Sequence, residues 1–173
     1  MFKGLDLATF WDDSEHALNE YVSPPPSDEL IAEVQRELGH TLPAAYVAMM
    51  RIHNGGVPCR RCFPTQAPTS WAADHVAITG ILGIGRDKSC SLCGALGSEF
   101  MVEAWGYPRI GIYFADCPSA GHDMIAMDYR ACGPSGEPSI AHVDQENGYR
   151  ITPLAPDFET FVRGLTHESV FED

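Results

Sequence analysis

The sequence predicts an α+β fold built as a single domain. Three segments with helical periodicity precede any strand, several short β-type segments follow, and one more helical segment comes last. Elements that are grouped in this way favour an α+β fold over an alternating α/β fold. The 173 residues, 45% of them hydrophobic, suffice for one sizeable core but make two domains improbable. We expect one domain over 1–173, with its core at about 7–165 and an acidic, partly loose tail at 166–173.

Three helices are expected in the first third of the chain, over residues 7–21, 27–38 and 42–52. Each carries apolar side chains at helical spacing, and the first two carry acidic side chains on the opposite face. Three consecutive prolines end the first helix, and Ser27 is a suitable N-cap for the second. Gly39 ends the second helix, and an Asn-Gly-Gly sequence ends the third.

The middle of the chain is less regular. Residues 57–71 show no periodicity and contain prolines and cysteines, which predicts a long ordered loop with one short strand. The mostly apolar run at 76–84 contains β-branched residues and indicates a buried strand. A short helix is expected over 98–105, with Ser98 as its cap.

The last third of the chain predicts an antiparallel meander. Apolar runs at 110–114, 124–129 and 139–143 are separated by segments rich in turn residues. Residues 149–153 are expected to add an edge strand. A final amphipathic helix is expected over 157–165.

The formal net charge of −13 is concentrated at the two ends of the chain. Residues 1–40 hold nine acids against two bases, whereas residues 41–156 are close to balance. A negative field repels phosphate backbones and attracts basic proteins, so we expect a basic protein partner and no nucleic acid. Acids near the N-terminus interrupt the region where a signal peptide would need an apolar run, and no run approaches membrane-spanning length, so we expect a cytoplasmic protein without a membrane partner.

The acidic side chains on the outer faces of the first two expected helices are the candidate partner-binding residues. Their summed field matters more than any single member, and the alternative is that they serve only solubility. The residues are Asp12, Asp13, Glu15, Glu20, Glu29, Glu33 and Glu37.

Two Cys-x-x-Cys pairs, Cys59 with Cys62 and Cys90 with Cys93, are the clearest metal-capable pattern. Four thiolates can close a tetrahedral zinc site, and such a site has no open position for substrate. The predicted ion is therefore structural, a clamp for long loops, and no cofactor is required for function. The 27 residues between the pairs exceed the spacing of compact zinc ribbons, so free thiols in adjoining loops remain the alternative. Neither pair lies between a strand and a helix, which disfavours redox catalysis.

The turn "DCPSAGHD" places four residues close together in sequence, Asp116, Cys117, His122 and Asp123. Three more, Asp128, His142 and Asp144, follow on neighbouring expected strands. These residue types suit a metal site or a Cys–His nucleophile pair. A wide turn needs Asp, Ser and Gly for backbone reasons alone, however, and no nucleophile elbow is present. We assign no catalytic residue from the sequence, and an enzyme using this turn remains a minor alternative.

Several segments in order resemble the SUKH superfamily, which comprises bacterial toxin-immunity proteins and fungal regulators of cell-wall synthesis. The resemblance covers nearly the whole chain, from about residue 7 to residue 165. It includes the Phe10-Trp11 pair, Tyr46, and the segments "ELGHTLP", "NGG", "ITGILGIG", "YPRIGIYFAD", "AGHDMIAMDYR", "GEPSIAHVD" and "DFETFVRGL".

The resemblance implies helices packed around a curved, mostly antiparallel sheet, and a role as a binder without established catalytic residues. It also implies an immunity protein that binds and blocks a cognate toxin domain, often a nuclease. An acidic surface could occupy the basic groove of such a nuclease. The alternative is a regulatory scaffold for protein–protein interaction. The pattern of the superfamily does not require the Cys-x-x-Cys pairs, so these are a local addition.

Overall fold

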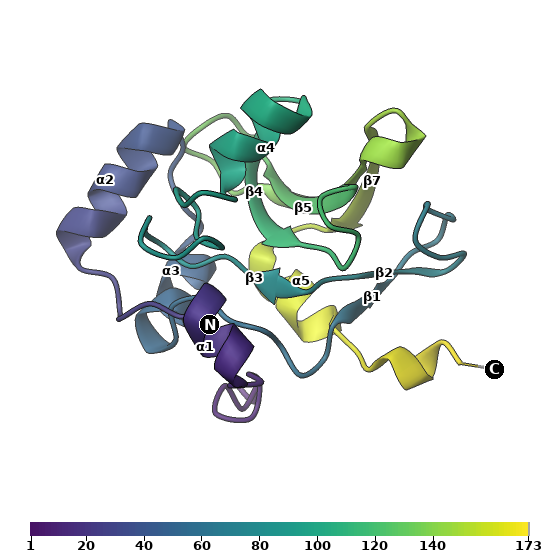
Figure 1. The fold of residues 1–173 in the computed structure, drawn as a ribbon, viewed down its shortest axis with the longest axis horizontal. Coiled ribbons are helices and arrows are strands. Elements are labelled where there is room, and N and C mark those ends of the chain that lie inside the picture. Colours follow the sequence, from purple (N-terminus) through teal and green to yellow (C-terminus); the bar gives the residue numbers. More distant parts are fainter. Residues whose placement is uncertain (173) are drawn as a thin grey trace.

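The computed structural model describes residues 1–172 and confirms the α+β class (Figure 1). The helices are α1 (Glu15–Glu20), α2 (Asp28–Leu38), α3 (Ala44–Ile52), α4 (Ser98–Trp105) and α5 (Phe158–Gly164), with two 3₁₀ turns, η1 (Gln145–Asn147) and η2 (Glu168–Val170). The strands are β1 (Cys62–Pro64), β2 (His75–Ala77), β3 (Gly80–Ile81), β4 (Gly111–Asp116), β5 (Asp123–Asp128), β6 (Ser139–Asp144) and β7 (Arg150–Ala155).

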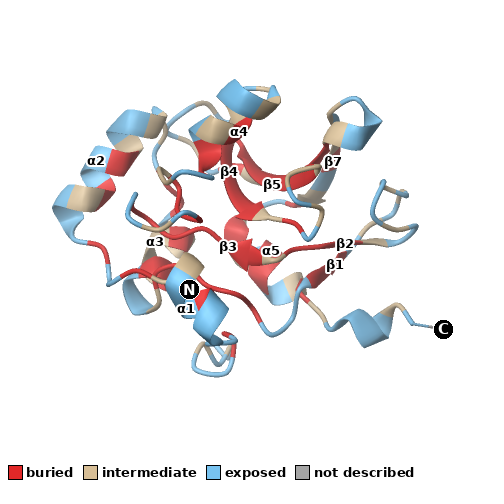
Figure 2. Cartoon of the chain, in the orientation of Figure 1, coloured by how far each residue is buried: buried red, intermediate tan, exposed pale blue. Residues whose placement is uncertain are grey.

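A five-stranded antiparallel sheet in the order β3-β4-β5-β6-β7 forms the centre of the molecule. It confirms the expected meander and edge strand, because consecutive strands pair along the whole series. Helices α3 and α5 pack on one face over the larger apolar core, and α4 packs on the other face over a smaller one. Burial is greatest along the sheet and lowest on the outer sides of α1 and α2 (Figure 2).

The expected first helix is wrong in its first half. Helix α1 begins only at Glu15, where the Ser14 side chain accepts a hydrogen bond from the Ala17 N–H (3.2 Å). Before it, Trp11 forms a β-bridge with Pro58, and its ring stacks on His53 at 4.7 Å. Pairing with a distant loop therefore overrides the local helical period, which the apolar residues alone could not reveal.

The expected strand over 76–84 is divided between two sheets. Strand β2 pairs with β1 in a two-stranded ribbon, and β3 then joins the five-stranded sheet beside β4. Strand β3 begins under Tyr21, so closely that a Cβ on Gly80 would lie 2.3 Å from the ring. The break is therefore imposed by packing against the end of α1.

The α4 helix is confirmed, but its cap differs from the expectation. Gly97 is the N-cap, and Ser98 is the first helical residue. The Ser98 hydroxyl instead accepts a hydrogen bond from the Tyr113 N–H (2.9 Å). It thereby ties α4 to β4.

The C-terminal segment contacts the ribbon along the part that the structure describes. Thr166 forms a β-bridge with Cys62, and Phe171 stacks on His75 with ring centroids 4.2 Å apart. None of the helices within residues 1–172 combines the length and the apolar character needed to cross a membrane.

Candidate binding surface and buried metal-ligand cluster

The seven predicted acidic residues form what we call the acidic surface, on α1, α2 and the turn before α1. Six of them are exposed, and only Glu20 is partly buried. Two are engaged within the chain: Asp13 contacts His53 (3.0 Å), and Glu37 pairs with Arg86 (2.8 Å). The others are available to a partner.

The helix geometry of α2 explains why its acids face outward. Ile31 and Val34 are buried on its inner side, so Glu29 and Glu33 lie on the outer side. Ser27 caps the helix by accepting a hydrogen bond from the Leu30 N–H (3.1 Å). Acids in the first turn also suit the positive end of the helix dipole.

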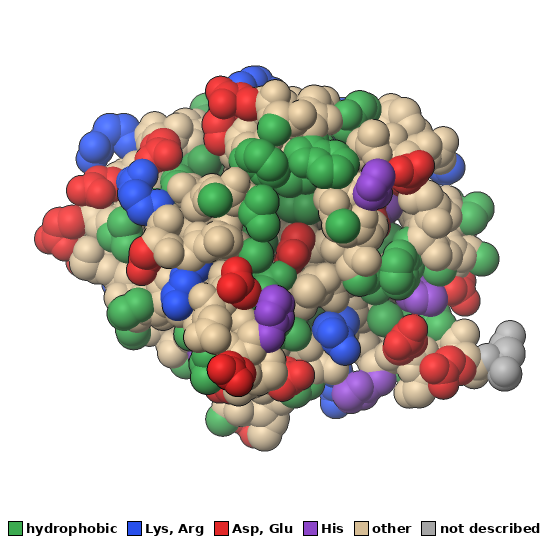
Figure 3. Space-filling view, in the orientation of Figure 1, with side chains coloured by type: hydrophobic (Ala, Val, Ile, Leu, Met, Phe, Trp, Pro, Cys, Tyr) green, Lys and Arg blue, Asp and Glu red, His purple; other side chains and the backbone are tan. Residues whose placement is uncertain are grey.

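A second feature, the apolar groove, lies between α4, the loop before it and the β4–β5 turn. It has a volume of about 350 Å³, and Figure 3 shows hydrophobic side chains gathered at the corresponding part of the surface. Its lining residues include Leu96, Phe100, Met101, Trp105, Cys117 and Met124. Leu96 is 48% exposed at the edge of this site, so its side chain is open to a partner.

One carboxylate lies in this apolar lining. Asp116 accepts hydrogen bonds from the Tyr21 hydroxyl (2.7 Å) and from the Gly80 N–H (3.1 Å). Burial raises the pKa of Asp116 to about 6, although the hydrogen bond from Tyr21 lowers it. The group therefore changes charge near neutral pH.

The groove and the acidic surface meet at the end of α1. Tyr21, the C-cap of α1, reaches Asp116, and the Cys90 N–H donates to the Glu20 carbonyl (3.2 Å). Lys88 also donates from Nζ to the Leu18 carbonyl (3.3 Å). An apolar depression thus borders an exposed acidic helix.

The two Cys-x-x-Cys pairs lie in different surroundings. Cys62 begins β1, and Cys59 precedes it at the surface. Burial raises the pKa of Cys90 to about 11, and burial together with Glu37 raises the pKa of Cys93 to about 12. Within residues 1–172 the four thiols are not among the side chains that converge at metal-ligand distances. The structural zinc clamp stays a prediction.

A different set of ligand-type side chains does converge. One ligand atom each of Cys117, Asp123 and His142 lies within 4.8 Å of the other two, and all three residues are buried. His142 Nε2 is 2.7 Å from Asp123 Oδ2. Burial and the carboxylates of Asp123 and Asp116 raise the pKa of the Cys117 thiol well above its ordinary value.

Strand register produces this cluster. Asp123 opposes Asp144 and Ile125 opposes His142 across β5 and β6, so these side chains share the face of the larger core. Cys117 directly follows β4 and joins them from the adjacent turn. Sequence reasoning had noted these residues, but only the register shows which of them meet.

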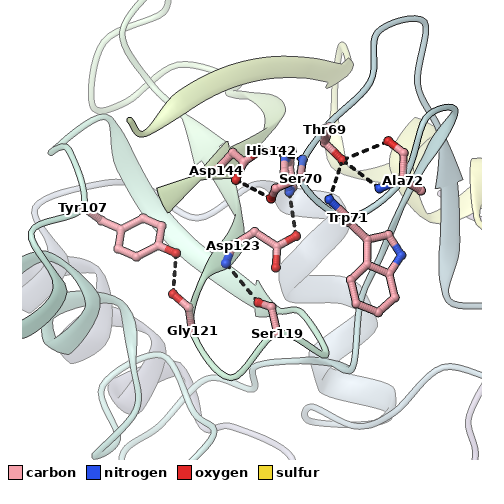
Figure 4. A network of polar contacts seen from close by, with 10 residues as sticks. All are labelled: Thr69, Ser70, Trp71, Ala72, Tyr107, Ser119, Gly121, Asp123, His142 and Asp144. Carbon is pink, nitrogen blue, oxygen red and sulfur yellow. Dashed lines mark hydrogen bonds and ion pairs between the residues drawn. The ribbon is translucent and has the colours of Figure 1, made fainter. Parts of the chain in front are cut away.

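The surrounding turns hold the cluster in place (Figure 4). Ser119 accepts a hydrogen bond from the Asp123 N–H (3.0 Å), and Tyr107 donates to the Gly121 carbonyl (2.6 Å). Gly121 has φ +97°, and a Cβ there would lie 3.1 Å from the Trp105 ring, so the turn needs glycine. His122 instead lies at the surface of the turn, near Gln145 (3.1 Å).

Asp144 is not free to join the cluster, because the β1–β2 loop occupies its carboxylate. The Ser70 N–H donates to Oδ2 (2.9 Å) and the Ser70 hydroxyl to Oδ1 (2.6 Å). Residues 70 and 144 thereby fasten the two-stranded ribbon to the sheet. Asp144 therefore has a structural role, because it links the β1–β2 loop to β6.

The fold and these surfaces define an α+β domain that offers an acidic surface and an apolar groove to other molecules. Residues 25–164 match the SMI1/KNR4 family (SUKH-1), and the chain belongs to this family. The family consists of immunity and regulatory proteins, generally non-enzymatic, that bind partner proteins. A comparison with curated proteins finds no match.

Proposed function

We propose that this protein is an immunity protein. It neutralises a cognate toxin that has a basic surface, by stoichiometric binding and without turnover. The observation that carries the proposal is the acidic surface, where six of seven side chains are exposed and only Asp13 and Glu37 contact a basic side chain of the described residues, His53 and Arg86. A chain of net charge −13 attracts a cationic partner and repels nucleic acid. The toxin class best suited to such a surface is a nuclease, whose own substrate is a polyanion.

The apolar groove can supply the binding affinity that exposed acidic side chains do not provide. Exposed charges steer association but add little affinity individually, whereas an apolar side chain buried in a pocket can supply a binding hot spot. Two other residues of the groove lining contact the end of α1: the Cys90 N–H donates to the Glu20 carbonyl, and Asp116 accepts from Tyr21. We therefore expect a partner segment with basic residues beside one large apolar side chain.

The electrostatic half of the proposal is tested by charge reversal. The variant Glu29→Lys, Glu33→Lys should slow association with the toxin domain encoded beside this gene by about 10-fold or more at low salt. The difference from the unmodified chain should shrink as salt rises, because exposed charges are screened. The matched control is Glu137→Lys, Glu168→Lys, two exposed acids outside the acidic surface and the groove, which should bind nearly as the unmodified chain does. Binding that ignores both reversal and salt would contradict the electrostatic claim.

The groove is tested separately. Leu96→Asp should weaken the complex about 10-fold or more, chiefly through faster dissociation, because it places a charge in the apolar contact. The control is Ile52→Asp, since Ile52 is 65% exposed on α3 and does not line the groove. Equal effects of the two substitutions would remove the groove from the interface.

A regulatory scaffold remains the second candidate function. The groove favours it, because an apolar depression suits a peptide of a host protein as well as a toxin. A genomic neighbourhood without a toxin gene, together with capture of a host peptide that Leu96→Asp abolishes, would favour the scaffold over the immunity protein.

A further inference from the structure

The cluster of Cys117, Asp123 and His142 combines three different metal-ligand types in one enclosed place. The residues are 3%, 1% and 0% exposed. Thiolate sulfur, imidazole nitrogen and carboxylate oxygen are all ligands of Zn²⁺, and mixed sets of these donors occur in its sites. These side chains come from separate segments and meet below the protein surface, whereas a cluster of acidic residues at the surface is solvated.

Two polar atoms of the cluster have no hydrogen-bond partner. These are Asp123 Oδ1 and His142 Nδ1, both fully enclosed. A buried polar atom without a partner costs free energy and requires an explanation. A cation coordinated among these side chains would satisfy the carboxylate and would fix one tautomer of the imidazole.

Charge balance favours the same interpretation. The Asp123 carboxylate is buried in the protein: Oδ2 lies 2.7 Å from His142 Nε2, and Oδ1 has no hydrogen-bond partner. A divalent cation bound by one carboxylate, one thiolate and one neutral imidazole gives a site of zero net charge. Such a site avoids the cost of an uncompensated buried charge.

The cluster borders the apolar groove through Cys117. One ligand is therefore placed between the interior and a surface depression. A proposed metal site needs an entry path, and we expect it on this side of the cluster. The Ser119 and Ser70 contacts hold the neighbouring turns, which gives the ligands a fixed frame.

We propose that Cys117, Asp123 and His142 form a buried Zn²⁺ site, separate from the four cysteines of the Cys-x-x-Cys pairs. Binding displaces the thiol proton of Cys117, which passes to solvent, and the thiolate sulfur binds the ion. Three protein ligands leave the fourth position of a tetrahedral ion to a water molecule or to the second oxygen of Asp123. The ion would join the β4–β5 turn to β6.

The test uses the full chain, freed of metal with a chelator and titrated with Co²⁺ and then with Zn²⁺. We expect one Co²⁺ per chain, with the visible absorption of a tetrahedral ion and a charge-transfer band from a single thiolate, both lost when Zn²⁺ displaces Co²⁺. The variant Cys117→Ser should lose the charge-transfer band. It should also weaken binding by about 100-fold or more, because even outer partners of metal ligands contribute 10- to 100-fold.

The control variant is Cys59→Ser, Cys93→Ser, which removes one thiol from each Cys-x-x-Cys pair at its more exposed position. It should keep the spectrum and the affinity of the unmodified chain. A band from several thiolates that this control abolishes would overturn the proposal in favour of the four-cysteine clamp.

Two further outcomes would also overturn the proposal: a folded chain that binds no stoichiometric Co²⁺, or one whose Co²⁺ spectrum is octahedral and lacks a thiolate band. The spectrum of the unmodified chain counts the thiolates on its own. The number of thiolate ligands is therefore measured even if Cys117→Ser does not fold.

Discussion

The Cys-x-x-Cys pairs and the Cys117 cluster present metal-ligand side chains in opposite ways. The pairs are conspicuous in sequence, yet their four thiols are not among the ligand-type side chains that converge within residues 1–172. The cluster has no sequence motif, because its members come from the β4–β5 turn, β5 and β6. Strand register brings residues together that spacing along the chain cannot. Short-range spacing is therefore a weaker guide to a site than the pairing of strands.

The largest expected difference between the two regions is in stability. His142→Ala should lower the free energy of unfolding of the metal-free chain by about 3 to 5 kcal/mol, because it leaves the buried Asp123 without its partner. Cys59→Ser, at an exposed thiol, should change the same quantity by less than about 0.5 kcal/mol. Urea unfolding in the presence of a chelator measures both. Similar small losses in the two variants would mean that the cluster is not a buried, coupled unit.

A smaller effect is expected at Asp116, which lies between the two regions. Its pKa is raised to about 6 in the folded chain, so the folded state binds this proton more tightly than the unfolded state does. The contribution of Asp116 to stability is therefore greatest below about pH 4 and is lost as the pH rises through 6. Asp116→Asn removes this ionisation. Its free energy of unfolding, relative to that of the unmodified chain, should therefore rise by about 1 to 2 kcal/mol from pH 5 to pH 8.

Urea unfolding at the two pH values measures this gain. Two neighbouring groups are coupled to Asp116: His16 lowers its pKa, and Asp116 raises the pKa of Cys90. The measured quantity is therefore the difference in the free energy of unfolding between Asp116→Asn and the unmodified chain at each pH. A difference that does not depend on pH would show that the carboxyl stays ionised throughout.

The smallest effect concerns reactivity and leaves stability unchanged. Cys59 is exposed and should be modified early by a thiol reagent at pH 8, whereas the buried Cys117 should react only on unfolding. Cys93 is partly exposed, but with a pKa of about 12 only about one thiol in 10⁴ is ionised at pH 8. Its rate should rise about tenfold for each pH unit up to pH 10. Mass spectrometry of timed samples gives the order, and early modification of Cys117 would contradict the enclosed cluster.

Local patterns predicted most of the elements. The meander over β4, β5 and β6 follows from apolar runs separated by turn residues, and α2 follows from its cap, its stripe and Gly39. The errors lie where distant segments compete with local preference. Trp11 leaves the expected helix to bridge Pro58, and the expected strand over 76–84 divides just before Gly80, on which Tyr21 packs closely.

Of the two candidate surfaces, the sequence predicts one and not the other. The exposed position of the acidic residues follows from helical periodicity, since buried residues such as Val34 fix the opposite face. The apolar groove has no comparable signal, because Leu96, Trp105 and Cys117 belong to segments that only packing brings together. The Asp116 pKa likewise depends on burial by Tyr21 and its neighbours.

By itself the sequence determined the α+β class, the order of most elements and the excess of negative charge, because periodicity, caps and composition act over short stretches of chain. The tertiary structure alone decided that Cys117, Asp123 and His142 meet and that an apolar groove opens beside the end of α1. Both results depend on strand register and on contacts between distant segments. The turn that contains Cys117 and Asp123 is visible in the sequence, but which of its side chains meets His142 is not.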